Sequence, residues 1–136
     1  AYESTLYAGT YGNGVQRSAD RGKTWKLMDN GMDHSGIESL MLTSPDNNHL
    51  LAGANGAIYY TADGGLHGSK VNSTCGDCFA FAGNTINSSH YAATSTGFYH
   101  SVSTNNWIQS NGGLTSLDCR SIVIDRKTGY LYLGTK

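Results

Sequence analysis

The segment Leu6-Tyr7-Ala8-Gly9-Thr10 is the main indication of the fold, because its pattern returns three times along the 136-residue chain. The later copies align with it without gaps: Leu50-Leu51-Ala52-Gly53-Ala54, His90-Tyr91-Ala92-Ala93-Thr94 and Leu131-Tyr132-Leu133-Gly134-Thr135. The second residues of the four copies lie 44, 40 and 41 residues apart. A period of this length indicates a repeat architecture in which each repeat is one supersecondary unit.

Two further sets of segments keep the same period. One set opens a preceding strand: Ile37-Glu38-Ser39-Leu40, Cys78-Phe79-Ala80-Phe81 and Cys119-Arg120-Ser121-Ile122. The other set begins with a glycine and opens a third strand: Gly14-Val15, Gly56-Ala57 and Gly97-Phe98. Each of the first three units is expected to end in a short outer strand. These strands begin near Trp25, Ser69 and Trp107, respectively. Four strands in about 41 residues is the spacing of a β-propeller blade.

Turn residues separate the predicted strands. Asn13-Gly14 and Asn55-Gly56 precede third strands, where a two-residue hairpin favours positive φ at both central positions. Residues 45–48 and 125–129 separate first from second strands and have the composition of ordinary hairpin loops. The chain holds 18 Gly, one Pro and two Glu, which disfavours helices. The predicted fold class is therefore all-β.

The repeats predict one domain, residues 1–136, built of four-stranded antiparallel blades, with about three blades present. Blade 1 (1–33) is partial and lacks its innermost strand, blades 2 (34–74) and 3 (75–115) are complete, and blade 4 (116–136) holds two strands. A propeller closes with roughly four to eight blades. We therefore expect other copies of the chain, or further blades, to complete the ring, and we expect no stable isolated monomer.

An acidic turn follows each predicted third strand. Ser18-Ala19-Asp20-Arg21-Gly22-Lys23-Thr24-Trp25 fits the pattern S-x-D-x-G-x-x-W. The second copy, residues 61–68, keeps the Asp and the Gly but lacks the Trp. The third copy, residues 101–107, keeps the Ser and the Trp, has Ser in place of the Asp, and is one residue shorter. We name these segments the first, second and third box.

The boxes resemble the Asp-box, or BNR, repeat of sialidase-like, sortilin-like and xyloglucanase-like β-propellers, and the resemblance spans nearly the whole chain. It implies a structural role at the blade periphery, away from the ligand face, for ten residues: Ser18, Asp20, Gly22, Trp25, Thr61, Asp63, Gly65, Ser101, Ser103 and Trp107. The Asp can accept hydrogen bonds from backbone N–H groups of its own turn, and the Gly permits positive φ. The Trp can cover the outer edge of the blade.

Uncharged polar residues dominate the composition. Ser, Thr and Asn number 39, against 19 charged residues and a formal net charge of −1. With Tyr and Gly, these residues suit the exposed strands and turns of a secreted or cell-surface protein. Lys and Arg are not in excess, so we expect no nucleic-acid partner. No apolar run approaches the roughly 20 residues of a membrane helix. Glycans or extracellular proteins are the expected partners.

The three cysteines are predicted to be structural. Cys75 and Cys78 have C-x-x-C spacing, while Cys78 and Cys119 occupy the same position in adjacent repeats. The alternatives are a loop disulfide, Cys75–Cys78, or a bridge between blades, Cys78–Cys119, with the odd cysteine free or paired to another chain. A zinc site would need two further ligands at suitable spacing, and the five His are scattered. We predict neither a metal nor a cofactor.

Three carboxylates are the candidates for catalysis. Asp33, Asp77 and Asp118 lie in loops that enter successive inner strands. Paired carboxylates are what glycoside hydrolysis needs, and the resemblance to xyloglucanase-like propellers implies acids on loops at the ligand face. The alternative is that these residues cap turns and recur because the repeat was duplicated. A sialidase site is excluded, because the resemblance implies an arginine triad and Arg120 alone lies beside an inner strand.

Aromatic side chains suggest a recognition surface. The candidates fall in or near third strands and turns: Tyr11, Tyr59, Tyr60, Tyr99 and His100, with Arg120 as a polar candidate beside an inner strand. Aromatic faces can stack on sugar rings. Alternate members of a strand can instead pack between blades, because side chains in a strand alternate between its two faces.

The sequence thus favours an extracellular propeller that acts as a scaffold or recognition module for glycan or protein and has no catalysis of its own. Two alternatives stay open. The first is a fragment of a xyloglucanase-like propeller glycoside hydrolase whose other blades supply most of the active site. The second is a self-assembling structural or filament protein joined through its incomplete ends, where an unpaired strand edge can accept another strand.

Overall fold

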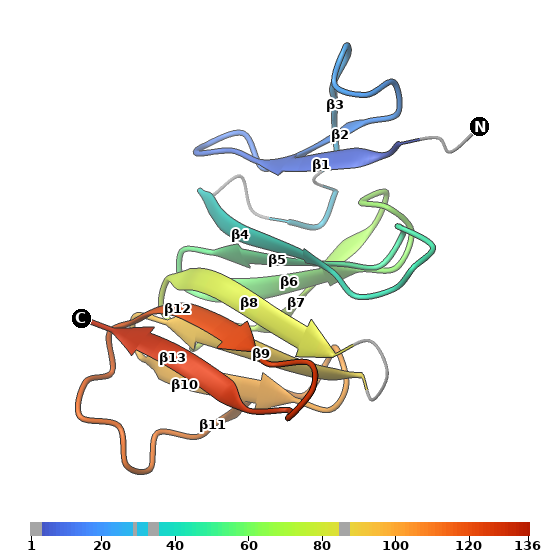
Figure 1. Cartoon of the computed structure of the whole chain (residues 1–136). Helices are drawn as coiled ribbons and strands as arrows, with labels where there is room; N and C mark the ends of the chain where they lie inside the picture. Colours follow the sequence, from blue (N-terminus) through green and yellow to red (C-terminus); the bar gives the residue numbers. More distant parts are fainter. Residues whose placement is uncertain (1–3, 29, 33–35, 85–87) are drawn as a thin grey trace.

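The computed structural model describes residues 4–28, 30–32, 36–84 and 88–136 (Figure 1). The described residues form thirteen strands and no helix. In chain order the strands are β1 (Leu6–Gly9), β2 (Val15–Ser18), β3 (Lys26–Leu27), β4 (Ile37–Leu42), β5 (Leu50–Ala54), β6 (Ala57–Thr61), β7 (Gly68–Asn72), β8 (Cys78–Asn84), β9 (Ser89–Thr94), β10 (Gly97–Ser101), β11 (Ile108–Gln109), β12 (Cys119–Ile124) and β13 (Leu131–Thr135).

The strands form four antiparallel sheets, each made of consecutive strands. The sheet orders are β1-β2-β3, β4-β5-β6-β7, β8-β9-β10-β11 and β12-β13. We call these sheets blades 1 to 4. Figure 1 shows them following one another in chain order, from blue at blade 1 to red at blade 4. This arrangement confirms the predicted all-β fold and its partial propeller.

Two apolar clusters hold neighbouring blades together. The first lies between blades 1 and 2 and includes Val15, Leu50 and Tyr59, each at most 1% exposed. The second lies between blades 2 and 3 and includes Leu51 and Ile58, both fully buried. Successive residues of β5 therefore face opposite neighbours, as the two-residue side-chain alternation of a strand requires. The core of the molecule is the set of contacts between blades.

In blades 1 and 2, a glycine in the second strand lets the next blade approach closely. A Cβ atom added at Gly53 would lie only 2.7 Å from the carbonyl oxygen of Cys78 in blade 3. At the same repeat position, a Cβ on Gly9 would lie 2.6 Å from Cγ2 of Ile37 in blade 2. The Ala-Gly pair seen in the sequence repeat is thus a point of contact between blades.

The first two boxes fold as matching hydrogen-bonded turns. Asp20 Oδ1 accepts hydrogen bonds from Thr24 N (2.9 Å) and Ser18 Oγ (2.8 Å). Asp63 Oδ1 accepts the equivalent bonds from His67 N (2.9 Å) and Thr61 Oγ1 (2.8 Å). In the third box, which lacks the Asp, Ser101 Oγ instead donates to the carbonyl oxygen of Ser103.

The two box tryptophans differ in burial, but each makes the same kind of hydrogen bond within its own turn. Trp25 Nε1 donates to the carbonyl oxygen of Gly22, and Trp107 Nε1 donates to that of Thr104, both at 3.1 Å. Trp107 is 9% exposed and lies in the apolar cluster between blades 2 and 3, whereas Trp25 is 44% exposed. Each indole therefore closes its own turn.

The predicted Asn-Gly hairpins are wrong in detail. β1 and β2 pair as far as Gly9 and Val15, so five residues connect them instead of two. Asn55-Gly56 does form a two-residue connection, between the paired residues Ala54 and Ala57. Among the described residues, however, positive φ occurs at Gly14 (62°) and Gly56 (77°) and not at the preceding asparagines. Glycines supply the left-handed conformation in both turns, with Gly12 (88°) also positive in the longer one.

Neither predicted disulfide is formed. Cys75, Cys78 and Cys119 are free thiols and are fully buried. Cys78 packs against Gly53 of blade 2, whereas Cys119 begins blade 4 on the far side of blade 3. Burial raises the pKa of all three thiols, that of Cys75 to about 11. The cysteines therefore act as small apolar side chains at the contacts between blades.

Candidate functional site

Each inner strand carries a β-bulge at the same repeat position. The pairing register shifts between Ile37 and Ser39 in β4, between Cys78 and Ala80 in β8, and between Cys119 and Ser121 in β12. The extra residues at these shifts are Glu38, Phe79 and Arg120. A bulge leaves its extra residue outside the pairing ladder and redirects its side chain, and bulges often stand next to functional sites.

The bulges gather a charged and aromatic cluster. The guanidinium Cζ of Arg120 lies 4.2 Å from the ring centroid of Phe79. Arg120 Nε is 2.6 Å from Asp118 Oδ1, and Nη2 donates to Asp118 Oδ2 at 2.9 Å. A guanidinium that is stacked on a ring and engages both oxygens of a carboxylate is held in one orientation. We call Glu38, Asp77, Phe79, Asp118 and Arg120 the bulge site.

Acidic groups dominate the electrostatics of the bulge site. The hydrogen bond to Asp118 is the main cause that raises the pKa of the Arg120 guanidinium, and partial burial opposes it. The charges of Asp118, Asp77 and Glu38 act in the same direction as that hydrogen bond. Three carboxylates thus act on one guanidinium, which disfavours anionic ligands and favours ligands that donate hydrogen bonds.

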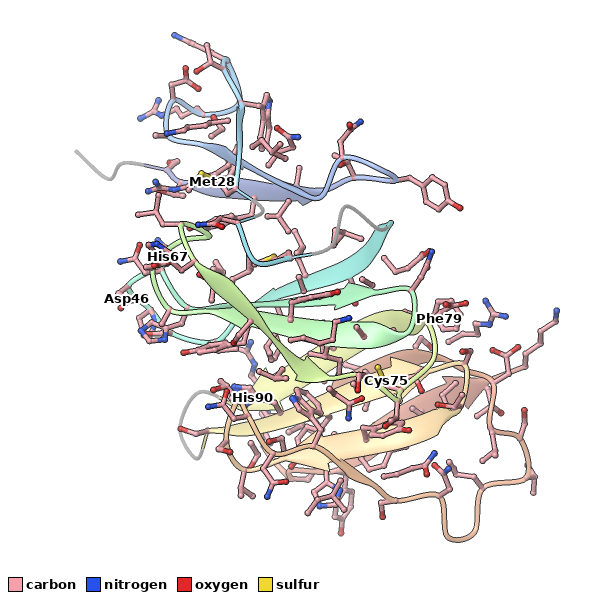
Figure 2. The ribbon with its side chains drawn as sticks, turned by 180° about the vertical axis from the view of Figure 1, so that it is seen from behind. Met28, Asp46, His67, Cys75, Phe79 and His90 are labelled. Carbon is pink, nitrogen blue, oxygen red and sulfur yellow. The ribbon has the colours of Figure 1, made fainter. Side chains whose placement is uncertain are left out.

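The bulge site and the boxes lie at opposite ends of the blades. Figure 2 shows Phe79 and Cys75 at one end, and Asp46, His67 and His90 at the other. The alternation of strand direction explains this. In an antiparallel sheet, the loops that enter inner strands and the loops that follow third strands lie at opposite ends of the strands. We call these two ends of the blades the bulge end and the box end.

The predicted acidic residues divide between the described and undescribed parts of the chain. Asp33 lies outside the described residues. Asp77 and Asp118 are half-buried, and both act on Arg120, as expected for loops that enter adjacent inner strands. Asp118 contacts Arg120 through both oxygens, which fixes the orientation of its carboxylate. The predicted ligand residue Arg120 therefore lies at the centre of the cluster.

The structure does not bring the predicted aromatic residues together. Tyr59 and Tyr99 are only 1% and 4% exposed and belong to the apolar clusters between blades, so they are not surface ligands. Tyr11 is 83% exposed, between β1 and β2. His100 is half-buried beside Phe98, and Tyr60 hydrogen-bonds to His49 at the box end. Tyr59 and Tyr99 are buried because side chains alternate between the two faces of a strand, and both lie on faces covered by a neighbouring blade.

Sequence reasoning missed Glu38 and Phe79. A signal was present, because both residues align with Arg120 when the inner strands are placed in register. That column holds an acidic, an aromatic and a basic residue, whereas the columns on either side hold the small or apolar residues expected of a buried strand. When one position of a regular repeat varies while its neighbours do not, that position is a candidate for contact with a ligand or partner.

An apolar cavity lies farther along the inner strands. This cavity of about 350 Å³ is lined mainly by apolar residues of β4, β8 and β12, including Met41, Phe81 and Ile122. None of the five bulge-site residues lines it. Within the described part of the chain, no three His, Cys, Asp or Glu side chains form a group that could hold a metal ion. In the same residues, no helix is long and apolar enough to span a membrane.

Comparison with known proteins shows the fold but no family. The chain is similar to an ancestral GH74 enzyme (TM-score 0.79, 18% identity, 96% of this chain and 20% of that one). It is also similar to the GH74 enzyme of Niastella koreensis (TM-score 0.79, 21% identity, 98% and 23%). A third similar structure is the extracellular domain of a one-component system from B. thetaiotaomicron (TM-score 0.77, 17% identity, 99% and 19%).

These similarities cover only part of each neighbour and do not extend to a protein family. The chain spans about a fifth of the length of each of these neighbours. No family model matches the sequence, and no curated protein matches it. The neighbours therefore establish the β-propeller architecture of the chain, while what it binds has to be argued from its own residues.

Proposed function

We propose that the protein is an extracellular propeller segment that recognises carbohydrate at the bulge site and has no catalysis of its own. The observation that carries this proposal is the alignment of Glu38, Phe79 and Arg120 on three successive bulges. Two kinds of neighbour support it, GH74 enzymes and an extracellular domain.

The bulge site offers the contacts that a sugar ring needs. Because the Arg120 guanidinium covers one face of the Phe79 ring, the C–H groups of a sugar can pack on its other face or its edge. The carboxylates of Glu38 and Asp77 can accept hydrogen bonds from hydroxyls, and the Arg120 guanidinium can donate them. Because Arg120 is already fixed by Asp118 and Phe79, little side-chain entropy is lost when a ligand binds.

The experiment is a glycan-binding measurement on the intact protein and two arginine variants. Arg120→Ala removes the centre of the bulge site, and we expect at least about tenfold weaker binding, as for the loss of one good charged hydrogen bond. Arg126→Ala is the matched control, because Arg126 is exposed in the β12–β13 loop at the box end. Equal binding by wild type and Arg120→Ala would rule out the bulge site as the recognition surface.

Hydrolysis is the second candidate. Asp77 and Asp118 occupy one repeat position on adjacent blades, and two carboxylates are the minimum for cleaving a glycosidic bond. Asp118 is already engaged by Arg120, which leaves Asp77 as the carboxylate that can reach a glycosidic oxygen. Release of reducing sugar from a bound glycan, lost in Asp77→Asn, would establish the enzyme. Binding without release would support recognition alone.

Further blades are the expected partner of blade 4. Val123 and Tyr132 on its outward side are each 59% exposed, whereas their blade 2 counterparts Met41 and Leu51 pack against blade 3. We propose that this side contacts another blade, from a second copy or from elsewhere in a longer ring. Sedimentation of a compact 14.5 kDa monomer would contradict this proposal, and open-ended polymers would support the self-assembling alternative.

A further inference from the structure

A second, polar pocket lies at the box end between blades 2 and 3. Its volume is about 360 Å³, within the usual range of small-ligand sites. Nine residues line it: five carry Ser or Thr hydroxyls, and the others are His49, Tyr60, His90 and Val102. None of the nine is an Asp, Glu, Lys or Arg. We call it the hydroxyl pocket. It shares no residue with the bulge site.

His90 lines both this pocket and the neighbouring apolar cavity, and it carries an unpartnered acceptor. Its side chain is 4% exposed, and Nδ1 lies 2.9 Å from the carbonyl oxygen of Ser88. A carbonyl can only accept, so Nδ1 carries the proton. Burial lowers the pKa of His90, and the ring is therefore neutral. Nε2 keeps a bare lone pair and, within the described residues, has no hydrogen-bond partner. Buried acceptors of this kind are rare, because leaving one unpaired costs free energy.

Tyr60 presents a second acceptor. Its hydroxyl oxygen lies 2.5 Å from His49 Nδ1, and His49 Nε2 lies 3.5 Å from Asp46 Oδ2. In the tautomer whose Nε2 proton faces the Asp46 carboxylate, Nδ1 accepts the Tyr60 proton. The lone pairs of the Tyr60 oxygen then remain available. Two aromatic side chains from adjacent blades thus line the pocket with hydrogen-bond acceptors.

The chemistry of the pocket selects the class of ligand. A matching ligand must donate hydrogen bonds to His90 and Tyr60, which both hydroxyls and ammonium groups can do. A charged group would enter a pocket with no opposite charge in its lining, and the loss of hydration would disfavour it. Neutral hydroxyls avoid that loss, and the Ser and Thr hydroxyls can turn to donate or accept as required.

We propose that the hydroxyl pocket binds a neutral polyhydroxy compound of the size of one sugar ring, whose hydroxyls donate to His90 Nε2 and Tyr60 Oη. This site is separate from the bulge site and does not depend on what binds there. A bound sugar would contact blades 2 and 3 together, so it would also stabilise the contact between them.

The test titrates the full chain with methyl glycosides of glucose, galactose, mannose and xylose. Glucuronate and glucosamine serve as charged comparators. Nitrogen NMR of the histidine side chains follows the Nε2 resonance of His90 directly. We expect a saturable shift of that resonance with at least one neutral sugar, and at least about tenfold weaker binding of the charged analogues.

His90→Phe keeps a ring of similar size and removes the acceptor, so it should weaken binding of the neutral sugar about tenfold or more. His100→Phe makes the same chemical change on the adjacent strand, outside the pocket lining, and should bind like wild type. If His90→Phe does not fold, Tyr60→Phe gives the same comparison with a change of one oxygen atom.

Three results would overturn the proposal. One is a His90 Nε2 resonance that no sugar moves, which would mean that ordered water satisfies the acceptor. Another is unchanged sugar binding in the folded His90→Phe and Tyr60→Phe variants. The last is equal affinity for charged and neutral sugars. Because Arg120→Ala leaves this pocket intact, loss of binding at one end can be distinguished from loss at the other.

Discussion

Ser39 Oγ donates a hydrogen bond of 2.8 Å to the carbonyl oxygen of Cys78 and thereby ties the inner strand of blade 2 to that of blade 3. The same Ser39 oxygen is the atom nearest to where a Cβ on Gly53 would stand, so both residues serve one close contact. In blade 4 the equivalent pair is Ser121 and Gly134. There the three atoms nearest to a Cβ added at Gly134 all belong to Ser121.

Replacing Gly53 by Ala should therefore destabilise the protein. The added methyl group would meet the Cys78 backbone, which cannot move without shifting blade 3, and overpacking of this kind costs about 1–3 kcal/mol. Urea unfolding gives the change in the free energy of unfolding. Gly134→Ala is the matched control and should cost less, because the Ser121 side chain can rotate away. A larger loss in the control would contradict the assigned contact.

The Asp of the first box should matter more for stability than for binding. Asp20→Ala removes the acceptor of the Thr24 amide and of two hydroxyls, and it should lower the unfolding midpoint. Glycan binding at the bulge end should survive in the folded variant. Lys23→Ala changes an exposed side chain of the same turn and should leave the midpoint nearly unchanged. An unaltered midpoint in Asp20→Ala would contradict a structural role for the box.

Stability should fall in acid as the two box carboxylates become protonated. The Thr24 hydroxyl is the main cause that lowers the pKa of Asp20 to about 2, and the His67 amide is the main cause that lowers the pKa of Asp63 to about 2. Because both values lie below the ordinary 3.8, this stability is complete above pH 3.8 and is lost as the pH falls towards 2. Melting temperatures over that range test this, and the double variant Asp20→Asn, Asp63→Asn should show a flatter profile.

The cysteines should react as buried thiols. Burial raises the pKa of Cys75, Cys78 and Cys119, so little reactive thiolate is present near neutral pH. We expect slow modification of the folded protein and rapid titration of three thiols in denaturant without reductant. A count of one thiol under those conditions would show that two cysteines form a disulfide, contrary to the structure.

The fold was predictable because its markers are local and recur. The Leu6–Thr10 pattern and the boxes each depend on residues close in sequence, and the repeat period converts them into blades. The five-residue connection after Gly9 was not predictable from Asn13-Gly14 alone, since the preceding Thr10 leaves the ladder to bond with Gly14. Gly14 has the required positive φ, but in a longer turn.

The site was less predictable than the fold. Asp77, Asp118 and Arg120 could be placed at one end of the blades from the order of the strands. Glu38 and Phe79 could be found only by comparing the aligned inner strands with one another, because a bulge depends on the pairing between two strands and has no signature within one of them. Tyr59 and Tyr99 failed as surface candidates for a related reason, since which side of a strand is covered depends on the neighbouring blade.

Recognition at the bulge site can be tested most directly by following its residues while a glycan binds. The NMR signals of the Arg120 Nε–H and of the Phe79 ring are to be followed while the intact protein is titrated with a glycan that binds it. We expect both signals to move together and to saturate at the affinity measured in solution. Saturable binding that leaves Arg120 and Phe79 unmoved would contradict the central claim that the three bulges form the recognition surface.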